Sequence, residues 1–198
     1  MEVKNINFEV TVYTSADELN EADKALLQEA RKATRAAYAP YSNFFVGAVA
    51  QMANGEKVSG TNQENASYPV GICAERVLLS VAATQYPGLG IDTLAISYHN
   101  KNGESNLPIS PCGICRQSLA EYEERTHQSI RVILSGMNGE VYILQKAGEL
   151  LPLSFMSSRP VRAPRPWRAA PASPCRSSRA SAAYFISPVR PCCRTARW

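Results

Sequence analysis

Short apolar or alternating runs recur along the first 155 positions of the chain. They are typical of β-strands, and they cover residues 8–13, 46–52, 56–60, 93–98, 130–134 and 141–144. The second and third runs flank Asn54-Gly55, and Asn138-Gly139 precedes the last one. Because these dipeptides favour tight hairpin turns, the pattern predicts antiparallel strand pairs at both places.

Two other segments, 74–84 and 113–126, carry apolar residues at the spacing of a helix with one buried face. A further helix is expected to run toward Tyr38, because Ser15 and Glu18 resemble a capping box. Strands and helices therefore alternate over residues 1–155, a length that can bury its own core. We predict one α/β domain there, with a three-layer α/β/α fold and a mixed sheet of five main strands.

Candidate chemistry lies at the starts of the two amphipathic helices. Cys73 precedes the first helix, and Cys112 and Cys115 open the second, three residues apart and so on one helix face. A catalytic zinc takes three protein ligands and leaves its fourth position to water, whereas a structural zinc is closed by four ligands. Glu75, two residues after Cys73, can then move protons to and from that water. The pattern predicts a catalytic zinc site.

The cysteines also allow other interpretations. A Cys-x-x-Cys pair by itself more often indicates a redox pair or part of a closed zinc site. A closed site needs a fourth ligand, and the two histidines, His99 and His127, lie in segments without ligand spacing. Three thiolates also outweigh a divalent ion by one charge, so a nearby cation would help. Arg76 and Arg116 directly follow the two clusters and are the candidates.

Several motifs together resemble one known family. They are Tyr38–Ala48, Asn62–Pro69, Cys73–Arg76 and Pro111–Gln117, and the Cys-x-Glu and Pro-Cys-x-x-Cys elements among them form the signature of zinc-dependent base deaminases. Over roughly residues 20–155 the chain resembles the small homotetrameric cytidine deaminases. The resemblance implies a cytidine-deaminase-like fold, one Zn²⁺ per subunit, and hydrolysis of cytidine and 2′-deoxycytidine to uridine and 2′-deoxyuridine with release of ammonia.

The resemblance also implies roles for single residues. It makes Cys73, Cys112 and Cys115 the zinc ligands, Glu75 the proton shuttle, and Arg76 the arginine that hydrogen-bonds the thiolates. Glu75 would accept a proton from the attacking water, protonate N3 of the pyrimidine and then protonate the leaving amino group.

Substrate contacts follow from the same resemblance. Asn62 and Glu64 match residues that hold the ribose hydroxyls, and Phe44 matches an aromatic side chain that packs on the pyrimidine. Main-chain contacts to the base and the reacting carbon would fall at Ala74, Pro111 and Cys112. Without the family match, Phe44 would be read as a core residue, and Asn62 and Glu64 as part of a polar loop.

The resemblance also predicts an oligomer. In the family, an aromatic residue matching Phe155 closes the active site of a neighbouring subunit, so a homotetramer with shared active sites is expected. The other expected partner is a small nucleoside. The chain has no apolar run of membrane-spanning length, and Met1–Asn5 lacks the charged and apolar pattern of a leader. Reduced thiols for zinc fit the cytosol, so we predict a cytoplasmic protein without a membrane partner.

The last segment, residues 156–198, has a different composition. It holds nine arginines and seven prolines but no lysine and no acidic residue. Because such a composition cannot bury enough apolar surface to fold, we predict a disordered Arg/Pro/Ala-rich tail. One explanation is a basic arm that binds nucleic acid. We favour the other, a frameshift artefact, because basic tails usually mix lysine with arginine.

Three rival functions remain at this point. They are deamination of a nucleoside-like antibiotic such as blasticidin S, deamination of cytosine in polynucleotides, and a zinc-bearing binding protein without chemistry. Residues 1–155 carry 12 basic and 17 acidic residues, which disfavours a nucleic-acid partner. A non-catalytic protein would be expected to lack Glu75 or the Asn62-x-Glu64 pair, and both are present.

Overall fold

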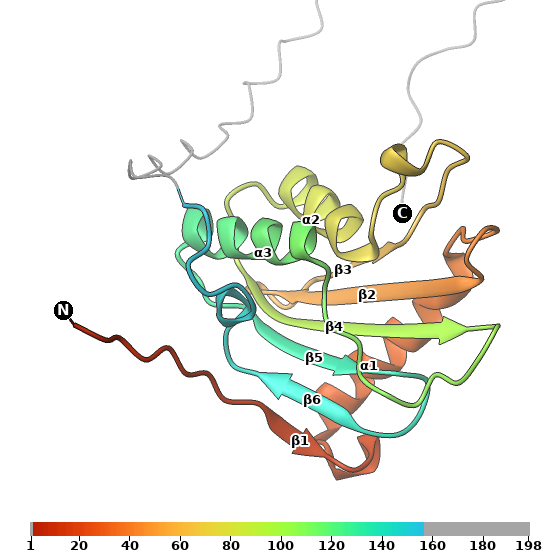
Figure 1. Ribbon diagram of the computed structural model, residues 1–198, viewed down its shortest axis with the longest axis horizontal. Helices are drawn as coiled ribbons and strands as arrows, with labels where there is room; N and C mark the ends of the chain where they lie inside the picture. The colour runs from red at the N-terminus through yellow and green to blue at the C-terminus, as the bar shows by residue number, and fades with distance from the viewer. Residues whose placement is uncertain (1, 157–198) are drawn as a thin grey trace, which may run out of the picture. The chain divides into compact units, whose positions relative to one another are not determined.

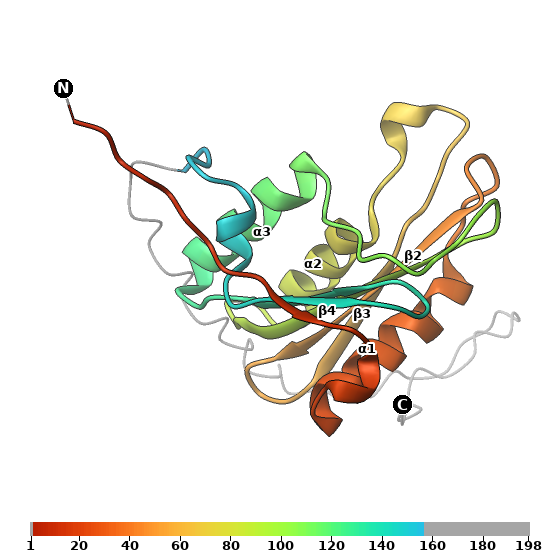
Figure 2. The same ribbon diagram turned by 60° about the horizontal axis from the view of Figure 1, so that its bottom comes forward.

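The computed structural model describes residues 2–156, and Figures 1 and 2 show how its elements are arranged. The tail predicted for residues 156–198 lies outside the described residues, apart from Met156. The strands are β1 (Thr11–Tyr13), β2 (Phe44–Met52), β3 (Lys57–Thr61), β4 (Ile91–Asn100), β5 (Arg131–Ser135) and β6 (Val141–Leu144). The α-helices are α1 (Glu21–Ala33), α2 (Ala74–Gln85) and α3 (Gly113–Thr126). Short 3-10 turns are η1 (Ala16–Glu18), η2 (Thr34–Ala36), η3 (Tyr68–Val70) and η4 (Ala147–Leu150).

The strands form one mixed sheet in the order β1-β6-β5-β4-β2-β3. All neighbours are antiparallel except β4 and β5, which are parallel and are joined through α3. The predicted α/β class and mixed sheet are confirmed, with six strands in place of five main ones. The sixth is the edge strand β1, which covers only the last three of residues 8–13 because Phe8 and Val10 remain exposed and unpacked.

Helices cover both faces of the sheet, so the predicted three layers are present (Figures 1 and 2). On one face, α1 packs through Leu26, Leu27 and Ala30 against apolar residues of β2, β4, β5 and β6. On the other, α2 and α3 pack through Leu78 and Leu119, among others, on the opposite side of the same strands. The two cysteine-bearing helices therefore share one face.

The helix predicted to run from Ser15 toward Tyr38 is interrupted. Ser15 caps only the short turn η1, and Leu19 then adopts an extended backbone with ψ of 154°. The long helix α1 starts instead after Asn20, whose side chain accepts a hydrogen bond from the Asp23 N–H. Asn20 is a strong N-cap residue, and this explains why the helix starts there.

A buried ion pair fastens the start of α1 to β5. The Asp23 carboxylate accepts hydrogen bonds from Nη1 and Nη2 of Arg131, both at 2.6 Å, and only 6% of Asp23 is exposed. Hydrogen bonding to Arg131 lowers the pKa of Asp23. This pair therefore stabilises the fold above the unfolded-state pKa of Asp23, and the stabilisation is lost as the pH falls through the lower folded-state pKa.

Replacing Asp23 with asparagine is expected to lower the free energy of unfolding by about 2 kcal/mol at pH 7, because a charged hydrogen-bond acceptor is lost. Below about pH 4 the difference from the wild type should shrink, since protonation of the Asp23 carboxylate then favours the unfolded state. Urea unfolding at both pH values measures this. Asp17→Asn, in the exposed pair with Lys24, is the control and should have a much smaller effect. An equal loss for both variants would contradict the role of Asp23.

Candidate active site

Three cysteine side chains converge where α2 and α3 begin. Cys73 is the N-cap residue of α2, Cys112 is the N-cap residue of α3, and Cys115 lies in the first turn of α3. The Sγ atoms all lie within 4.8 Å of one another, with 3.7 Å from Cys73 to Cys112 and 3.5 Å from Cys112 to Cys115. Cys115 is buried, Cys73 is half-buried and Cys112 is exposed. The group is thus anchored in the core and open on one side.

Close packing of β3 against α2 helps to place Cys73. A Cβ atom at Gly60 of β3 would lie 2.4 Å from both the Ala74 carbonyl oxygen and the Leu78 nitrogen. Only glycine leaves room for the first turns of α2 at this distance from the strand. The segment from Gly60 to Cys73 then returns the chain to the start of α2.

The donor set fits zinc. Tetrahedral zinc with sulfur ligands at about 2.3 Å requires sulfur separations of about 3.8 Å, which is close to the separations found here. Thiolates are soft ligands that favour zinc over magnesium or calcium. Among residues 2–156, no fourth ligand joins the group, whether from a histidine, a cysteine or a carboxylate. Three protein ligands are typical of catalytic zinc rather than structural zinc.

The three thiols influence one another's ionisation. Hydrogen bonding with Cys115 lowers the pKa of Cys73 to about 6, and the positive charge of Arg76 acts in the same direction. The same hydrogen bond raises the pKa of Cys115 far above its ordinary value. A bound divalent ion would favour the loss of the thiol protons.

Glu75 lies in the first turn of α2, two residues after Cys73. Only 5% of it is exposed, and burial raises the pKa of its carboxyl group. A carboxyl whose pKa is raised toward neutrality can both accept and return a proton. The group of possible metal ligands does not include the carboxylate of Glu75. This carboxylate is therefore available for proton transfer beside the three thiols.

The two arginines that follow the clusters differ in their contacts. Within residues 2–156, Arg76 makes no hydrogen bond to a thiol, and its effect on Cys73 is through charge alone. Arg116 donates from Nε to the Pro111 carbonyl at 2.7 Å and from Nη1 to the Leu150 carbonyl at 3.1 Å. Arg116 therefore ties the start of α3 to the C-terminal part of the domain.

Asn62 holds the first residues of β2, and Glu64 holds the segment that leads into this strand. The Asn62 side chain accepts from the Val46 N–H at 2.7 Å and donates to the Phe44 carbonyl at 2.9 Å. Glu64 accepts from the Tyr41 N–H at 2.9 Å and from the Ser42 hydroxyl at 2.5 Å. Each side chain retains further hydrogen-bonding capacity, since an amide group and a carboxylate can each make more bonds than these.

The aromatic residues of the predicted site lie in different surroundings. Phe44 is half-buried, and its ring stacks on Tyr98 with centroids 4.7 Å apart and planes at 16°. Phe155 is 84% exposed, but Gln117 of α3 holds its backbone at both polar atoms. Gln117 Nε2 donates to the Phe155 carbonyl at 2.6 Å, and the Phe155 N–H donates to Gln117 Oε1 at 3.2 Å.

No functional role was predicted from the sequence for Gln117 or Tyr98. Gln117 is the last residue of the Pro111–Gln117 motif, and its place there was the only available signal. Tyr98 looked like any apolar residue of a buried strand. Ala74 is fully buried at the first position of α2.

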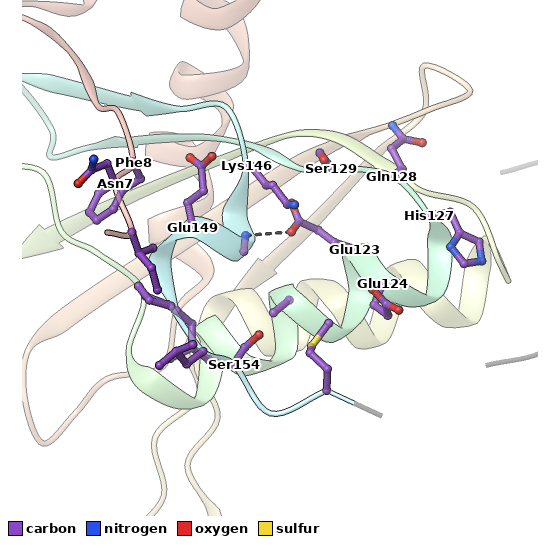
Figure 3. A pocket seen from close by; sticks show the side chains of 17 residues that line it. Asn7, Phe8, Glu123, Glu124, His127, Gln128, Ser129, Lys146, Glu149 and Ser154 are labelled. Atoms are coloured by element: carbon purple, nitrogen blue, oxygen red, sulfur yellow. Dashed lines mark hydrogen bonds between the residues drawn. The ribbon is translucent and has the colours of Figure 1, made fainter. Parts of the chain in front are cut away.

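One well-formed cavity lies away from the cysteines. It measures about 460 Å³ and lies beside α3, the segment after η4 and residues 6–8, and no cysteine lines it (Figure 3). Its central carboxylate, Glu123, accepts hydrogen bonds from the backbone N–H groups of Ile130, Ala147 and Gly148. Because these bonds satisfy the carboxylate, we assign Glu123 a structural role in fastening α3 to η4 and to the residue that precedes β5.

Comparison with known proteins places the chain. The family model for the cytidine and deoxycytidylate deaminase zinc-binding region matches residues 20–140. A cytidine deaminase of Halalkalibacterium halodurans is 38% identical over 130 residues, which cover 66% of this chain and 91% of that protein. The crystal structure of a cytidine deaminase from Burkholderia pseudomallei is 38% identical with a TM-score of 0.59, covering 69% of this chain and all of that one.

A second solved structure agrees. The cytidine deaminase from Mycobacterium tuberculosis is 31% identical with a TM-score of 0.52, over 67% of this chain and 96% of that one. Among the described helices, none is long and apolar enough to cross a membrane. The predicted enzyme class and zinc cofactor are confirmed by the family match and the three-cysteine group. The chain belongs to the zinc-dependent cytidine and deoxycytidylate deaminase family.

Proposed function

We propose that this protein hydrolyses cytidine to uridine with release of ammonia, and that it accepts 2′-deoxycytidine as well. The observation that carries the proposal is the buried carboxyl of Glu75 next to three thiols that can hold one ion. The relatives named cytidine deaminase support the choice of substrate.

In the proposed mechanism, Cys73, Cys112 and Cys115 hold the zinc. Bound zinc supplies a water molecule whose pKa is lowered toward neutrality. Glu75 takes a proton from this water as its oxygen bonds to C4 of the pyrimidine, and passes the proton to N3. The same carboxyl would then take the second proton from the oxygen now bonded to C4 and deliver it to the exocyclic amino group. The C4–N4 bond breaks as the C4 carbonyl forms, and ammonia leaves. Water and cytidine are thus converted to uridine and ammonia.

The remaining residues orient the nucleoside. We assign Phe44 to the face of the pyrimidine and the side chains of Asn62 and Glu64 to the ribose hydroxyls. Asn62 already holds the start of β2 and Glu64 the loop before it, so that this part of the chain and the sugar site are formed together. The main chain at Ala74, Pro111 and Cys112 would contact the base and the reacting carbon. A pocket that bonds sugar hydroxyls rejects ligands that lack them.

Ammonia release from a panel of substrates tests this assignment. Cytidine and 2′-deoxycytidine should both be turned over, whereas blasticidin S and a single-stranded DNA oligonucleotide should not. A polynucleotide substrate is disfavoured because residues 1–155 carry 17 acidic against 12 basic residues. Turnover of the oligonucleotide or the antibiotic in preference to cytidine would contradict the proposal.

We further propose a homotetramer with shared active sites, to which Phe155 contributes from a neighbouring subunit. Its backbone is fixed by Gln117 while its ring is exposed, an arrangement suited to contact with another chain. We place the protein in the cytoplasm, and we propose that residues 1–155 form the cytidine deaminase domain. A chain truncated after Phe155 should retain the activity of the full chain, and loss of activity would assign a function to the tail.

Replacing Gln117 with alanine is expected to raise the KM for cytidine roughly 3- to 10-fold, because two hydrogen bonds that fix Phe155 are lost. Steady-state kinetics measures the change. The matched control is Gln85→Ala at the exposed end of α2, which should leave KM unchanged. If the Gln117 variant also keeps the wild-type KM, then Phe155 does not act through this contact.

A further inference from the structure

Tyr98 lies on the face of the sheet that carries the candidate active site. It pairs with Val46 in the antiparallel register of β2 and β4. Alternate residues of a strand share a face, so Tyr98 lies on the same side as Leu94 and Ile96. Those two residues belong to the core under α2 and α3, the helices that bear the cysteines. Tyr98 therefore projects from the sheet toward the layer that holds the cysteine group.

The ring of Tyr98 supports Phe44. The two rings are nearly parallel, at 16°, with centroids 4.7 Å apart, which is the geometry of an offset stack. A hydrogen bond from the Asn62 side chain fixes the carbonyl of Phe44 at the same time. Tyr98 thus fixes the plane of the Phe44 ring, which we assign to pack on the pyrimidine. Asn62 fixes the position of Phe44 along β2.

The hydroxyl of Tyr98 is the unusual feature. Only 5% of the residue is exposed, yet among residues 2–156 its hydroxyl makes no hydrogen bond. Tyr122, which is 2% exposed, follows the usual rule and donates its hydroxyl to the Leu89 carbonyl at 2.9 Å. Within the same residues, every fully buried side-chain nitrogen or oxygen atom has a hydrogen-bond partner. The Tyr98 oxygen must therefore reach accessible space beside Phe44.

We propose that Tyr98 is a further substrate-binding residue, whose ring fixes Phe44 and whose free hydroxyl hydrogen-bonds the bound pyrimidine nucleoside. This inference rests on the proposed function, because Phe44 is its link to the substrate. A phenol can donate and accept, so it can pair with a carbonyl or a hydroxyl of the ligand. The unpaired hydroxyl gains in the complex the partner that it lacks within the described chain.

The variant Tyr98→Phe keeps the stack and removes only the hydroxyl. We expect the KM for cytidine to rise roughly 3- to 10-fold, with a much smaller change in kcat. The dissociation constant of uridine, measured by calorimetry on the zinc-loaded full chain, should rise by a similar factor. The matched control Tyr122→Phe breaks a structural hydrogen bond, so it should lower the unfolding midpoint and leave KM and the uridine affinity unchanged.

A double-mutant cycle tests the ring. Tyr98→Leu should raise KM more than Tyr98→Phe does, and this additional effect should vanish when Phe44 is replaced by alanine. A Tyr98→Phe variant with wild-type KM and wild-type uridine affinity, or additive effects in the cycle, would overturn the inference alone. A wild-type protein that neither converts cytidine nor binds uridine would overturn the proposed function and this inference together.

Discussion

Replacing Glu75 with alanine is expected to lower kcat for cytidine about 100- to 10,000-fold while one zinc per chain remains bound. The large effect follows from its place, since Glu75 is the carboxyl two residues after Cys73 and is 95% buried in the first turn of α2. The cysteine group includes no carboxylate, so removing Glu75 takes no ligand away. The variant Glu75→Gln keeps the shape of the side chain and should lose activity to a similar extent.

Kinetics and metal content must be measured on the same preparations. Glu124→Gln, an exposed glutamate on α3, is the control and should retain wild-type kcat. Retained zinc with lost turnover would support proton transfer by Glu75. A Glu75→Ala enzyme with normal kinetics would refute the assignment, and loss of zinc would show that Glu75 is a ligand instead.

The second large effect is expected at Cys112. Replacing it with alanine should reduce zinc from one per chain to a small fraction and abolish turnover, because two thiols hold the ion much more weakly than three. Cys112 is the best of the three for this test, since it is exposed and its loss leaves no hole in the core. Metal analysis after dialysis against a weak chelator measures the change.

A cysteine outside the cluster provides the control. Cys175→Ala lies beyond the described residues and should leave both zinc content and activity unchanged. Should Cys112→Ala retain a full equivalent of zinc after the same dialysis, the three-thiol site would not be the zinc site.

Local sequence patterns predicted much of this fold. The helix predicted for residues 113–126 is α3 with the same bounds, and the start predicted at residue 74 is that of α2. Both helices have an apolar face and begin directly after a cysteine. The hydrophobic periodicity and the position of the cysteine therefore predict the same helix start. The predicted start of α1 was wrong because Ser15 and Asn20 are both good N-cap residues, and the extended backbone at Leu19 separates them.

Interactions between distant parts of the chain were beyond prediction. The extent of β1 depends on how much of residues 8–13 finds a partner in β6, and the alternating pattern does not contain this information. Arg116 could have been a solvated charge, but its contact with Leu150 gives it a structural role. Gln117 and Tyr98 acquire their roles only through Phe155 and Phe44, residues 38 and 54 positions away.

Part of the candidate site was likewise predictable from local sequence, and part of it was not. Cysteine spacing indicated the ligand group because two of the three thiols lie within one helical turn. Bringing Cys73 to them requires the sheet, since Gly60 of β3 determines how closely α2 approaches. The sugar contacts were taken from a resemblance, and the structure adds that Asn62 holds the start of β2 and Glu64 the chain before it.

The central claim is that three sulfur atoms hold one zinc ion whose remaining position is free for water. X-ray absorption at the zinc edge of the loaded protein tests it most directly, because it counts the sulfur neighbours of the metal. We predict three sulfur scatterers and one lighter neighbour per zinc, and one sulfur fewer in Cys112→Ala protein reloaded at high zinc. Four sulfurs would show a closed structural site, and a sulfur-free shell would show that the ion binds elsewhere; either result would contradict the account.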